Sequence, residues 1–169
     1  MNELNDIRKI LSELAISQAK TEAQVKITSK IVSGIGVNLG KATELFFYES
    51  LADKMALGEI KFDSIHENVI VRKKRKEAEF DILMYNGDSI AIIETKHNVH
   101  EGDIDDLMTT KVNNFRSFFP NDAKHKIYLG IAGFAFDKKV QNIAVKHGIA
   151  VLKQKGETVS IHAKDLKNY

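Results

Sequence analysis

The sequence predicts an α/β domain, a mixed β-sheet flanked by helices, that follows a long N-terminal helix. Two observations predict this class. Short apolar runs bounded by turn residues indicate strands, and a helical spacing of apolar residues returns between the later runs. The predicted order is a helix, three strands of a meander, and then helix, strand, helix and strand. A hairpin section followed by crossover connections gives a mixed sheet with helices on both faces.

The 169 residues are 43% hydrophobic and 28% charged, which is typical of one globular domain with a short appendage. The lack of cysteine excludes disulfides, thiolate catalysis and cysteine-based zinc sites. The N-terminus has no signal-peptide pattern, and the longest apolar run, residues 127–136, is too short to span a membrane. We therefore expect a cytoplasmic protein with no membrane partner. The net charge of +2 gives no bulk attraction to nucleic acid.

Residues 1–33 are predicted to form one helix. Its first apolar residues have the 3-4-3 spacing of a coiled-coil seam: Leu4, Ile7, Leu11 and Leu14. The same register continues through Gln18, Thr21 and Val25, so the seam weakens after two heptads. Such a helix either packs on its own domain or pairs with another copy of the chain. We favour pairing, which predicts a homo-oligomer formed through residues 4–25.

Three glycines within seven residues predict a flexible hinge over residues 34–40. The main domain is expected at residues 41–169. Its first helix should begin near Asn38, since asparagine is a preferred residue at helix N-termini.

This first helix of the domain carries an acid on its apolar face. Glu44 precedes Phe47, Tyr48 and Leu51 by three, four and seven positions, so all four lie on one side. A buried carboxylate needs a partner or a purpose. The alternative is that Glu44 lies at the edge of the apolar stripe and reaches solvent.

The meander is predicted over residues 68–72, 79–85 and 89–96. Asn86-Gly87 joins the last two strands, and Asn-Gly between apolar runs is the strongest short-range hairpin signal. With a two-residue loop, Asp81 faces Ile92 and becomes a diagonal neighbour of Glu94 on the same face. A loop of three residues would turn Asp81 to the other face of the sheet.

The rest of the chain is predicted to complete the sheet and its helices. The helix over residues 102–119 ends before Pro120 and carries Lys111 on its apolar side. The run at residues 125–136 is too apolar for an exposed face, which predicts a central strand. A helix and two strands follow, over residues 137–148, 149–154 and 158–163.

Asp81, Glu94 and Lys96 are thus expected to converge on one face of the sheet. Hard carboxylate oxygens suit Mg²⁺ or Mn²⁺, with Asp81 and Glu94 as ligands. Such a metal acidifies a bound water and neutralises charge on a phosphodiester. A lysine beside it can deprotonate the water or stabilise the transition state. The same spacing also occurs by chance in charged proteins.

Asp81 followed by Glu94-Thr95-Lys96 at the end of an apolar strand resembles the PD-(D/E)XK nuclease superfamily, which has the restriction-endonuclease-like fold. The resemblance extends over residues 38–154. The stretches GKATELFFYESL, EFDIL, AIIETKHNV and VNNFRSFFP are similar to a group of uncharacterised bacterial members that carry an N-terminal helical segment.

The resemblance implies a nuclease-like domain that uses Mg²⁺ or Mn²⁺ and acts on DNA. It makes Asp81 and Glu94 the metal ligands and Lys96 the catalytic lysine. Glu44 would match the acid that many members carry on the first core helix. One departure is that Phe80 replaces the proline that precedes the aspartate in the family.

A run of five cations leads into the strand that bears Asp81: Arg72, Lys73, Lys74, Arg75 and Lys76. In a nuclease these side chains would contact phosphates near the site, and otherwise they form a solvated hairpin tip. Lys111 has the same two interpretations, a phosphate contact or an ammonium that extends from the core to solvent.

We therefore expect a Mg²⁺-dependent endonuclease that hydrolyses DNA. The alternative is a catalytically silent nuclease-like module that binds nucleic acid or acts as a scaffold and oligomerises through its N-terminal helix. A third interpretation makes the charges a structural ion-pair network in a domain that binds a protein.

Overall fold

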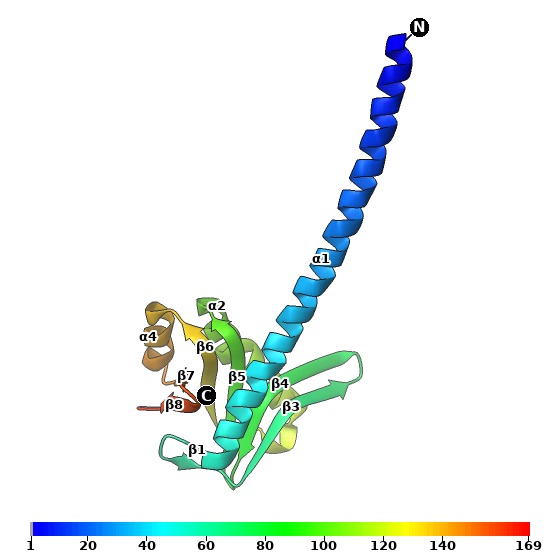
Figure 1. Cartoon of the computed structure of the whole chain (residues 1–169). Coiled ribbons are helices and arrows are strands. Elements are labelled where there is room, and N and C mark those ends of the chain that lie inside the picture. Colours follow the sequence, from blue (N-terminus) through cyan, green and yellow to red (C-terminus); the bar gives the residue numbers. More distant parts are fainter. Residues whose placement is uncertain (1) are drawn as a thin grey trace. The chain divides into compact units, whose positions relative to one another are not determined.

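The computed structural model describes residues 2–169, with side chains from Ile7 onward. The chain divides into two compact units, Met1–Leu39 and Gly40–Tyr169, which we describe separately. Helix α1 (Asn2–Lys54) contributes residues to both units (Figure 1). Within residues 2–169, no helix contains an apolar stretch long enough to cross a lipid bilayer.

Helix α1 corrects two expectations about its own limits. The backbone stays helical through residues 34–40, so the first helix does not end at residue 33, and Asn38 lies inside the helix rather than at its start. The expected flexibility of residues 34–40 stays a prediction. Each glycine costs about 1 kcal/mol relative to alanine in a helix interior. A helix that is already formed gains one hydrogen bond per added residue, so this cost weakens the segment without ending the helix.

The second unit is built on a six-stranded mixed sheet in the order β3-β4-β5-β6-β7-β8. The strands β3, β4 and β5 are antiparallel, β5, β6 and β7 are parallel, and β8 runs antiparallel to β7. This confirms the predicted mixed sheet, with the apolar strand β6 in its interior. The bounds are β3 Ser64–Lys73, β4 Lys76–Tyr85, β5 Ser89–Val99, β6 Lys126–Phe136, β7 Ala150–Lys155 and β8 Thr158–His162. A separate two-stranded hairpin, not expected from the sequence, is formed by β1 (Ala56–Leu57) and β2 (Ile60–Lys61).

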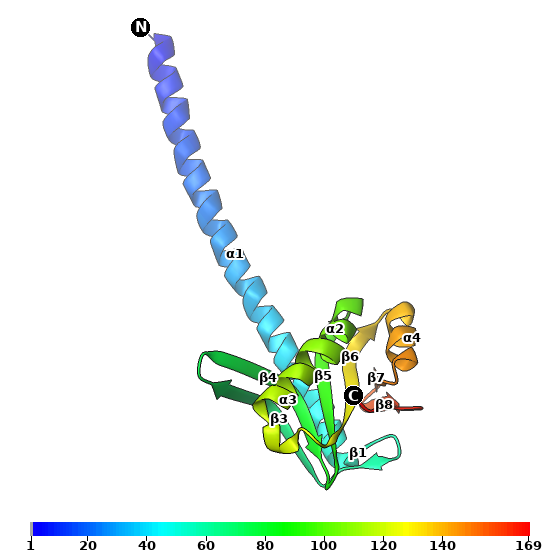
Figure 2. The same cartoon turned by 180° about the vertical axis from the view of Figure 1, so that it is seen from behind.

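Helices cover both faces of the sheet, as predicted (Figures 1 and 2). One face packs against the helices that follow β5 and β6, and the other packs against the end of α1, through Phe47 and Leu51. The single helix expected over residues 102–119 is a run of three helical pieces, and Pro120 does follow its end. The helical pieces are α2 Glu101–Asp106, the π-helical turn η1 Leu107–Lys111, α3 Val112–Phe118, the 3₁₀ turn η2 Pro120–Asp122 and α4 Lys138–Lys146.

The β4–β5 connection is two residues longer than expected. Leu83, not Asp81, pairs with Ile92, so the predicted pairing is wrong. The side-chain Oδ1 of Asn86 accepts the backbone N–H of Ser89 over 2.8 Å, which stabilises a longer turn than the two-residue form. Because the register shift is two residues, side chains along β5 keep the faces that the sequence predicted.

Strand β4 rotates about its axis at Asp81. The β4–β5 ladder ends at the pair Ile82–Ile93, so Asp81, the neighbour of Ile82 on β4, is not paired with β5. Phe80 packs on the face covered by α3, whereas Ile82 packs on the face covered by α1, although strict alternation would put both on one face. On β3, Asn68 lies opposite Asp81 in the register and has a positive φ of 48°. This irregularity frees Asp81 from the ladder and aims its side chain at β5.

Candidate active site

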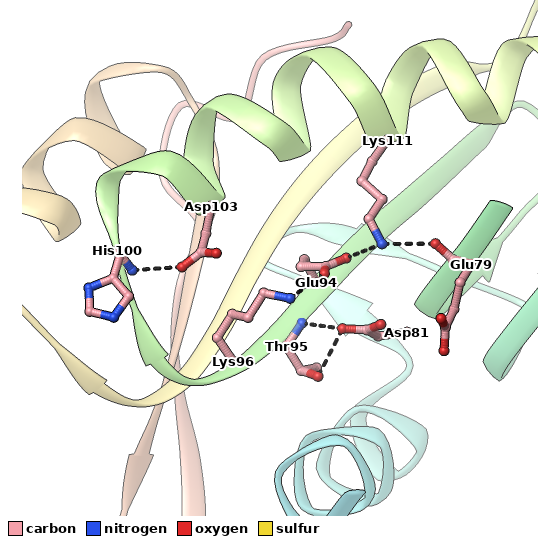
Figure 3. Close-up of polar contacts among 8 residues, drawn as sticks. All are labelled: Glu79, Asp81, Glu94, Thr95, Lys96, His100, Asp103 and Lys111. Atoms are coloured by element: carbon pink, nitrogen blue, oxygen red, sulfur yellow. Dashed lines mark hydrogen bonds and ion pairs between the residues drawn. The ribbon is translucent and has the colours of Figure 1, made fainter. Parts of the chain in front are cut away.

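Glu94 is the centre of the candidate site. It follows the apolar part of β5, and its side chain is only 7% exposed. The Nζ of Lys96 lies 2.8 Å from Oε1, and the Nζ of Lys111 lies 2.8 Å from Oε2 (Figure 3). Oε2 accepts no well-aligned hydrogen bond from the described residues, so the ion pair with Lys111 is its main compensation. One buried carboxylate is therefore held between two ammonium groups.

Lys111 enters the site from the helical layer. It is the last residue of η1, and its side chain is 14% exposed. Its Nζ also donates a 2.8 Å hydrogen bond to the backbone carbonyl of Glu79 and lies 5.9 Å from the centre of the Phe80 ring. A π-turn rotates the side chains that follow it, and such turns are frequent at functional sites. The ammonium does not extend from the core to solvent, which was one sequence interpretation, because it pairs with Glu94. A phosphate contact by Lys111 stays a prediction.

Asp81 joins the site through Thr95. The backbone N–H and the hydroxyl of Thr95 both donate to Oδ2 of Asp81, over 2.7 and 3.0 Å. The Asp81 carboxylate thus replaces the backbone acceptor that Thr95 would have found if the ladder had continued. Oδ1 accepts no hydrogen bond from the described residues and remains available to a ligand. The structure therefore gathers Asp81, Glu94 and Lys96 at the end of β5, as the sequence predicted (Figure 3).

Glu44 lies with this cluster. The side chain is half-buried, and its pKa is raised because burial disfavours the charged form and because the charges of Asp81, Glu79 and Glu94 are close. Lys96 offsets part of this effect. Glu44 is near the cluster and is also partly exposed, so both interpretations of this acid stay open. The four carboxylates outnumber the two lysines that face them.

The protonation of Lys96 bears on its role. Burial lowers the pKa of Lys96, but the hydrogen bond to Glu94 and the charges of Glu94, Asp81 and Asp103 outweigh burial, so the pKa is raised. An ammonium that holds its proton so firmly is a poor general base near neutral pH. In this arrangement Lys96 is better suited to stabilise negative charge than to deprotonate a water.

The site fits a divalent cation by charge and donor chemistry but is not arranged around one. Oδ1 of Asp81 and Oε2 of Glu94 are hard oxygens, which suit Mg²⁺ or Mn²⁺, and the excess of acids favours a cation. Among the described side chains, however, no group of three or more Asp, Glu or His converges as a ready metal site. Both carboxylate oxygens of Glu94 are paired with lysines in this structure, Oε1 with Lys96 and Oε2 with Lys111.

The basic run lies away from this cluster. Residues 72–76 form the tip of the β3–β4 hairpin, where Lys74 has a positive φ of 57° and Arg72 pairs with Glu77. Lys76 precedes Asp81 by five residues along β4, a separation of about 17 Å in an extended strand. The structure therefore does not bring this run into contact with the acids. Its side chains instead line a groove with Ser117 and Phe118.

Sequence reasoning missed Thr95 as a member of the site, and it missed the pairing of Lys111 with Glu94. Thr95 was taken only as a spacer between Glu94 and Lys96, and its two hydrogen bonds to Asp81 were not predicted. The pairing of Lys111 with Glu94 depends on the π-turn. The position of Lys111 on the apolar side of its helix was the sequence signal that this lysine pairs with a buried acid.

Comparison with known proteins found no matching family model and no matching curated protein. Two solved structures are similar at low levels. Can2 from Sulfobacillus thermosulfidooxidans, solved in complex with cyclic tetra-adenylate, has a TM-score of 0.46 and 13% identity over 66% of this chain and 32% of its own. AF1548, a protein of unknown function, has a TM-score of 0.35 and 19% identity over 64% of this chain and 58% of its own. The chain thus spans about a third of the first and less than two thirds of the second. The function proposed below rests on the site alone.

Proposed function

We propose that this chain is a metal-dependent nuclease that hydrolyses phosphodiester bonds of DNA. The observation that carries the proposal is Glu94, a buried carboxylate held by Lys96 and Lys111 beside Asp81 and Glu44. Gathering acids in this way costs stability, because they repel one another and lose hydration. A divalent cation and a phosphate group would offset that cost, whereas the fold alone gains nothing from it.

Each residue has a stated task in this proposal. Asp81 and Glu94 would hold Mg²⁺ or Mn²⁺, which supplies an acidified water and neutralises charge at phosphorus. Thr95 fixes the orientation of Asp81 through its two hydrogen bonds. Lys96, protonated beside Glu94, stabilises the negative charge that builds up on the phosphate oxygens during attack. Glu44 adds negative charge that favours the bound cation.

Cleavage of supercoiled plasmid and of branched DNA tests this proposal. We expect nicking with Mg²⁺ or Mn²⁺ and none with EDTA. Lys96→Ala and Asp81→Asn should lose cleavage, while Lys138→Ala, a change at an exposed lysine of α4, should retain it. Equal cleavage by all four proteins would mean a contaminating nuclease and would contradict the proposal.

A second candidate is a nuclease-like module without turnover that binds nucleic acid or acts as a scaffold. The observation that favours it is that both oxygens of Glu94 are already paired with lysines. Titration calorimetry with Mn²⁺ separates the possibilities. Heat that disappears in Glu94→Gln, together with cleavage, supports the nuclease, and the same heat without cleavage supports the silent module. No heat and no cleavage would favour a structural ion-pair network.

We also propose that the first unit pairs with a second copy of the chain through residues 4–25. Leu4, where the expected seam begins, lies outside the described side chains, but Ile7, Leu11 and Leu14 are more than half exposed. Because α1 continues without a break, the same heptad register extends beyond Val25 to further exposed residues, Val32 and Ile35.

Polar residues in this seam do not exclude pairing. The hydroxyls of Thr21 and Thr28 donate to backbone carbonyls one turn earlier, at Ser17 and Gln24, so their methyl groups are left to face a partner. A shallow hollow lined by Thr21, Gln24, Val25, Thr28 and Ser29 has the arrangement of a hole for a partner side chain.

A matched pair of substitutions tests the seam in the full chain. Val25 and Ile27 are 59% and 60% exposed, but only Val25 lies in the heptad register. Val25→Asp should dissociate the oligomer in sedimentation experiments, whereas Ile27→Asp should leave it intact. A monomeric parent protein, or equal dissociation by both variants, would contradict the pairing.

A further inference from the structure

A groove outside the candidate active site is lined by residues of α4, β7 and β8. These three elements lie at the β8 edge of the sheet (Figure 1). The walls of the groove carry Lys146 from α4, Lys153 from β7 and His162 from β8, together with neutral polar side chains such as Gln141 and Ser160. None of the lining residues is an acid. The lining therefore presents hydrogen-bond donors and positive charge without an internal counter-ion.

Lys153 is the most informative residue of the groove. The side chain is half-buried, and its Nζ lies 5.9 Å from the centre of the Phe136 ring. Its hydrogen bond goes to a neutral acceptor, Oε1 of Gln141, over 3.3 Å. Within residues 7–169, no carboxylate lies within ion-pair distance of Lys153, Lys146 or His162. Lys96 and Lys111, in contrast, both form ion pairs with Glu94. The Lys153 ammonium therefore remains to be neutralised by a ligand.

The surrounding segment is also basic. Residues 138–169 contain seven lysines and only two acids, an excess of five positive charges in a chain whose net charge is +2. These lysines are distributed along α4, β7 and the C-terminal residues instead of converging on one point. Spread-out cations match an extended chain of phosphates better than they match a single small anion.

The groove is separate from the acidic cluster. In the sheet register, Lys96 pairs with Gly133 and Gly133 pairs with Lys153, so the two lysines lie two strands apart, about 10 Å at the backbone. The side chains of Val99 and Phe136 fill the space over Gly133, because a Cβ placed there would lie 2.6 and 3.1 Å from them. A phosphate held by Lys153 would therefore not touch Glu94.

We propose that this groove binds the phosphate backbone of a nucleic-acid strand, with Lys153 and Lys146 as its main contacts. The site goes beyond the proposed nuclease function and does not depend on cleavage. It holds a strand without reading its bases, because the contacts are to phosphates. A strand bound here would be anchored on the side of the sheet opposite to the β3–β4 hairpin, since β8 and β3 are the two edge strands.

Fluorescence anisotropy with a labelled 20-nucleotide single strand, in EDTA to prevent cleavage, tests the proposal. The full chain is compared with Lys146→Gln/Lys153→Gln and with a matched control, Lys138→Gln/Lys164→Gln, which removes the same charge outside the groove lining. Each lost phosphate contact should flatten the plot of log affinity against log salt by about 0.7 for a single strand, so the groove variant should lose about 1.4. The control should change the slope by much less.

Three further results decide the proposal. Lys146→Gln/His162→Asn changes only exposed residues, so it should reproduce part of the loss even if Lys153→Gln disturbs folding. Equal losses in the groove variant and the control would mean diffuse attraction and overturn the proposal. Displacement of the strand by millimolar inorganic phosphate at constant ionic strength would indicate a small-anion site and overturn it as well. Because strand binding is measured in EDTA and cleavage is measured with Mg²⁺, failure of cleavage and failure of this site are distinguishable.

Discussion

The acidic cluster around Glu94 and the basic tip of the β3–β4 hairpin hold their charges in opposite ways. In the cluster, Lys111 is 14% exposed and has two oxygen partners, Glu94 and the carbonyl of Glu79. At the hairpin tip, Arg72 is 76% exposed and pairs only with Glu77, itself half exposed. Partners from two strands, β4 and β5, fix the ammonium of Lys111, whereas solvent screens the pair at the tip. Charges that must be placed accurately for chemistry are buried with partners, and charges that attract a polyanion can remain mobile.

The largest expected effect that separates the two regions is on cleavage. Lys96→Met should lower kcat/KM by about 10²-fold or more, because a positioned charge at the reacting phosphate is lost. Removing two hairpin cations, in Lys74→Gln/Lys76→Gln, should change kcat/KM by less than about tenfold at moderate salt. Single-turnover cleavage of a labelled duplex measures both. If Lys74→Gln/Lys76→Gln lowered kcat/KM as much as Lys96→Met, the proposed difference between the acidic cluster and the hairpin tip would be contradicted.

The next effect is on stability. Lys111→Met keeps the length of the side chain but leaves Oε2 of Glu94 without its ion pair, so we expect unfolding free energy to fall by about 2 kcal/mol. The matched change Arg75→Met at the exposed hairpin tip should alter it by less than about 0.5 kcal/mol. Urea unfolding in EDTA measures both values. A neutral Lys111→Met would mean that Lys96 alone is enough to neutralise Glu94.

The repulsion among the acids predicts how stability depends on pH in metal-free protein. The pKa of Glu44 is raised above its ordinary value of 4.5 in the folded state, so the folded chain binds more protons than the unfolded chain in this range. Stability from this group is therefore greatest below pH 4.5 and falls as pH rises through the folded pKa. Glu44→Gln should be more stable than the parent at pH 7 and equal to it near pH 4.

Thermal unfolding across this pH range in EDTA measures the Glu44 effect. Glu49→Gln, a change at an exposed acid on the same helix, serves as its control and should follow the parent curve. Added Mg²⁺ should reduce the difference between Glu44→Gln and the parent at pH 7, because the cation neutralises the cluster. A parent protein that becomes more stable as pH rises, relative to Glu44→Gln, would have the wrong sign for a repelled carboxylate.

The smallest effect concerns the salt dependence of duplex binding. If the hairpin cations contact phosphates, Lys74→Gln/Lys76→Gln should reduce the salt slope by up to about 1.8, with little change in melting temperature. Filter binding of a duplex at several salt concentrations with catalytically defective Lys96→Met measures it. An unchanged slope would identify the tip as a solvated turn, the alternative interpretation of its sequence.

Much of the fold followed from local pattern. Alternating apolar residues and the Asn-Gly turn predicted the strands. The alternation of side chains along a strand predicted that Glu94 and Lys96 share one face, even though the predicted loop was two residues too short. A register shift by an even number of residues leaves each side chain on the same face of the sheet. The predicted grouping of Glu94 and Lys96 was therefore correct although the predicted register was wrong. The convergence with Asp81 depended in addition on a rotation of β4, which no periodicity could predict.

What the sequence could not supply were the contacts between distant segments. Lys111 reaches Glu94 because a π-turn precedes it, and π-turns have no simple sequence signature. Similarly, the glycines were interpreted as a hinge at which the first helix ends, because a propensity scale treats each residue alone and ignores the helix on either side.

Those glycines leave a weak section in an otherwise continuous helix. A Cβ at Gly34, Gly36 or Gly40 would meet nothing within 4 Å among the described residues, so no packing requires them. Alanine at all three would strengthen the helix by about 3 kcal/mol, which means that the native chain forgoes that stabilisation. Backbone amides around residues 34–40 should therefore exchange with deuterium faster than those on either side. Local unwinding there would leave both residues 4–25 of the proposed seam and the sheet folded.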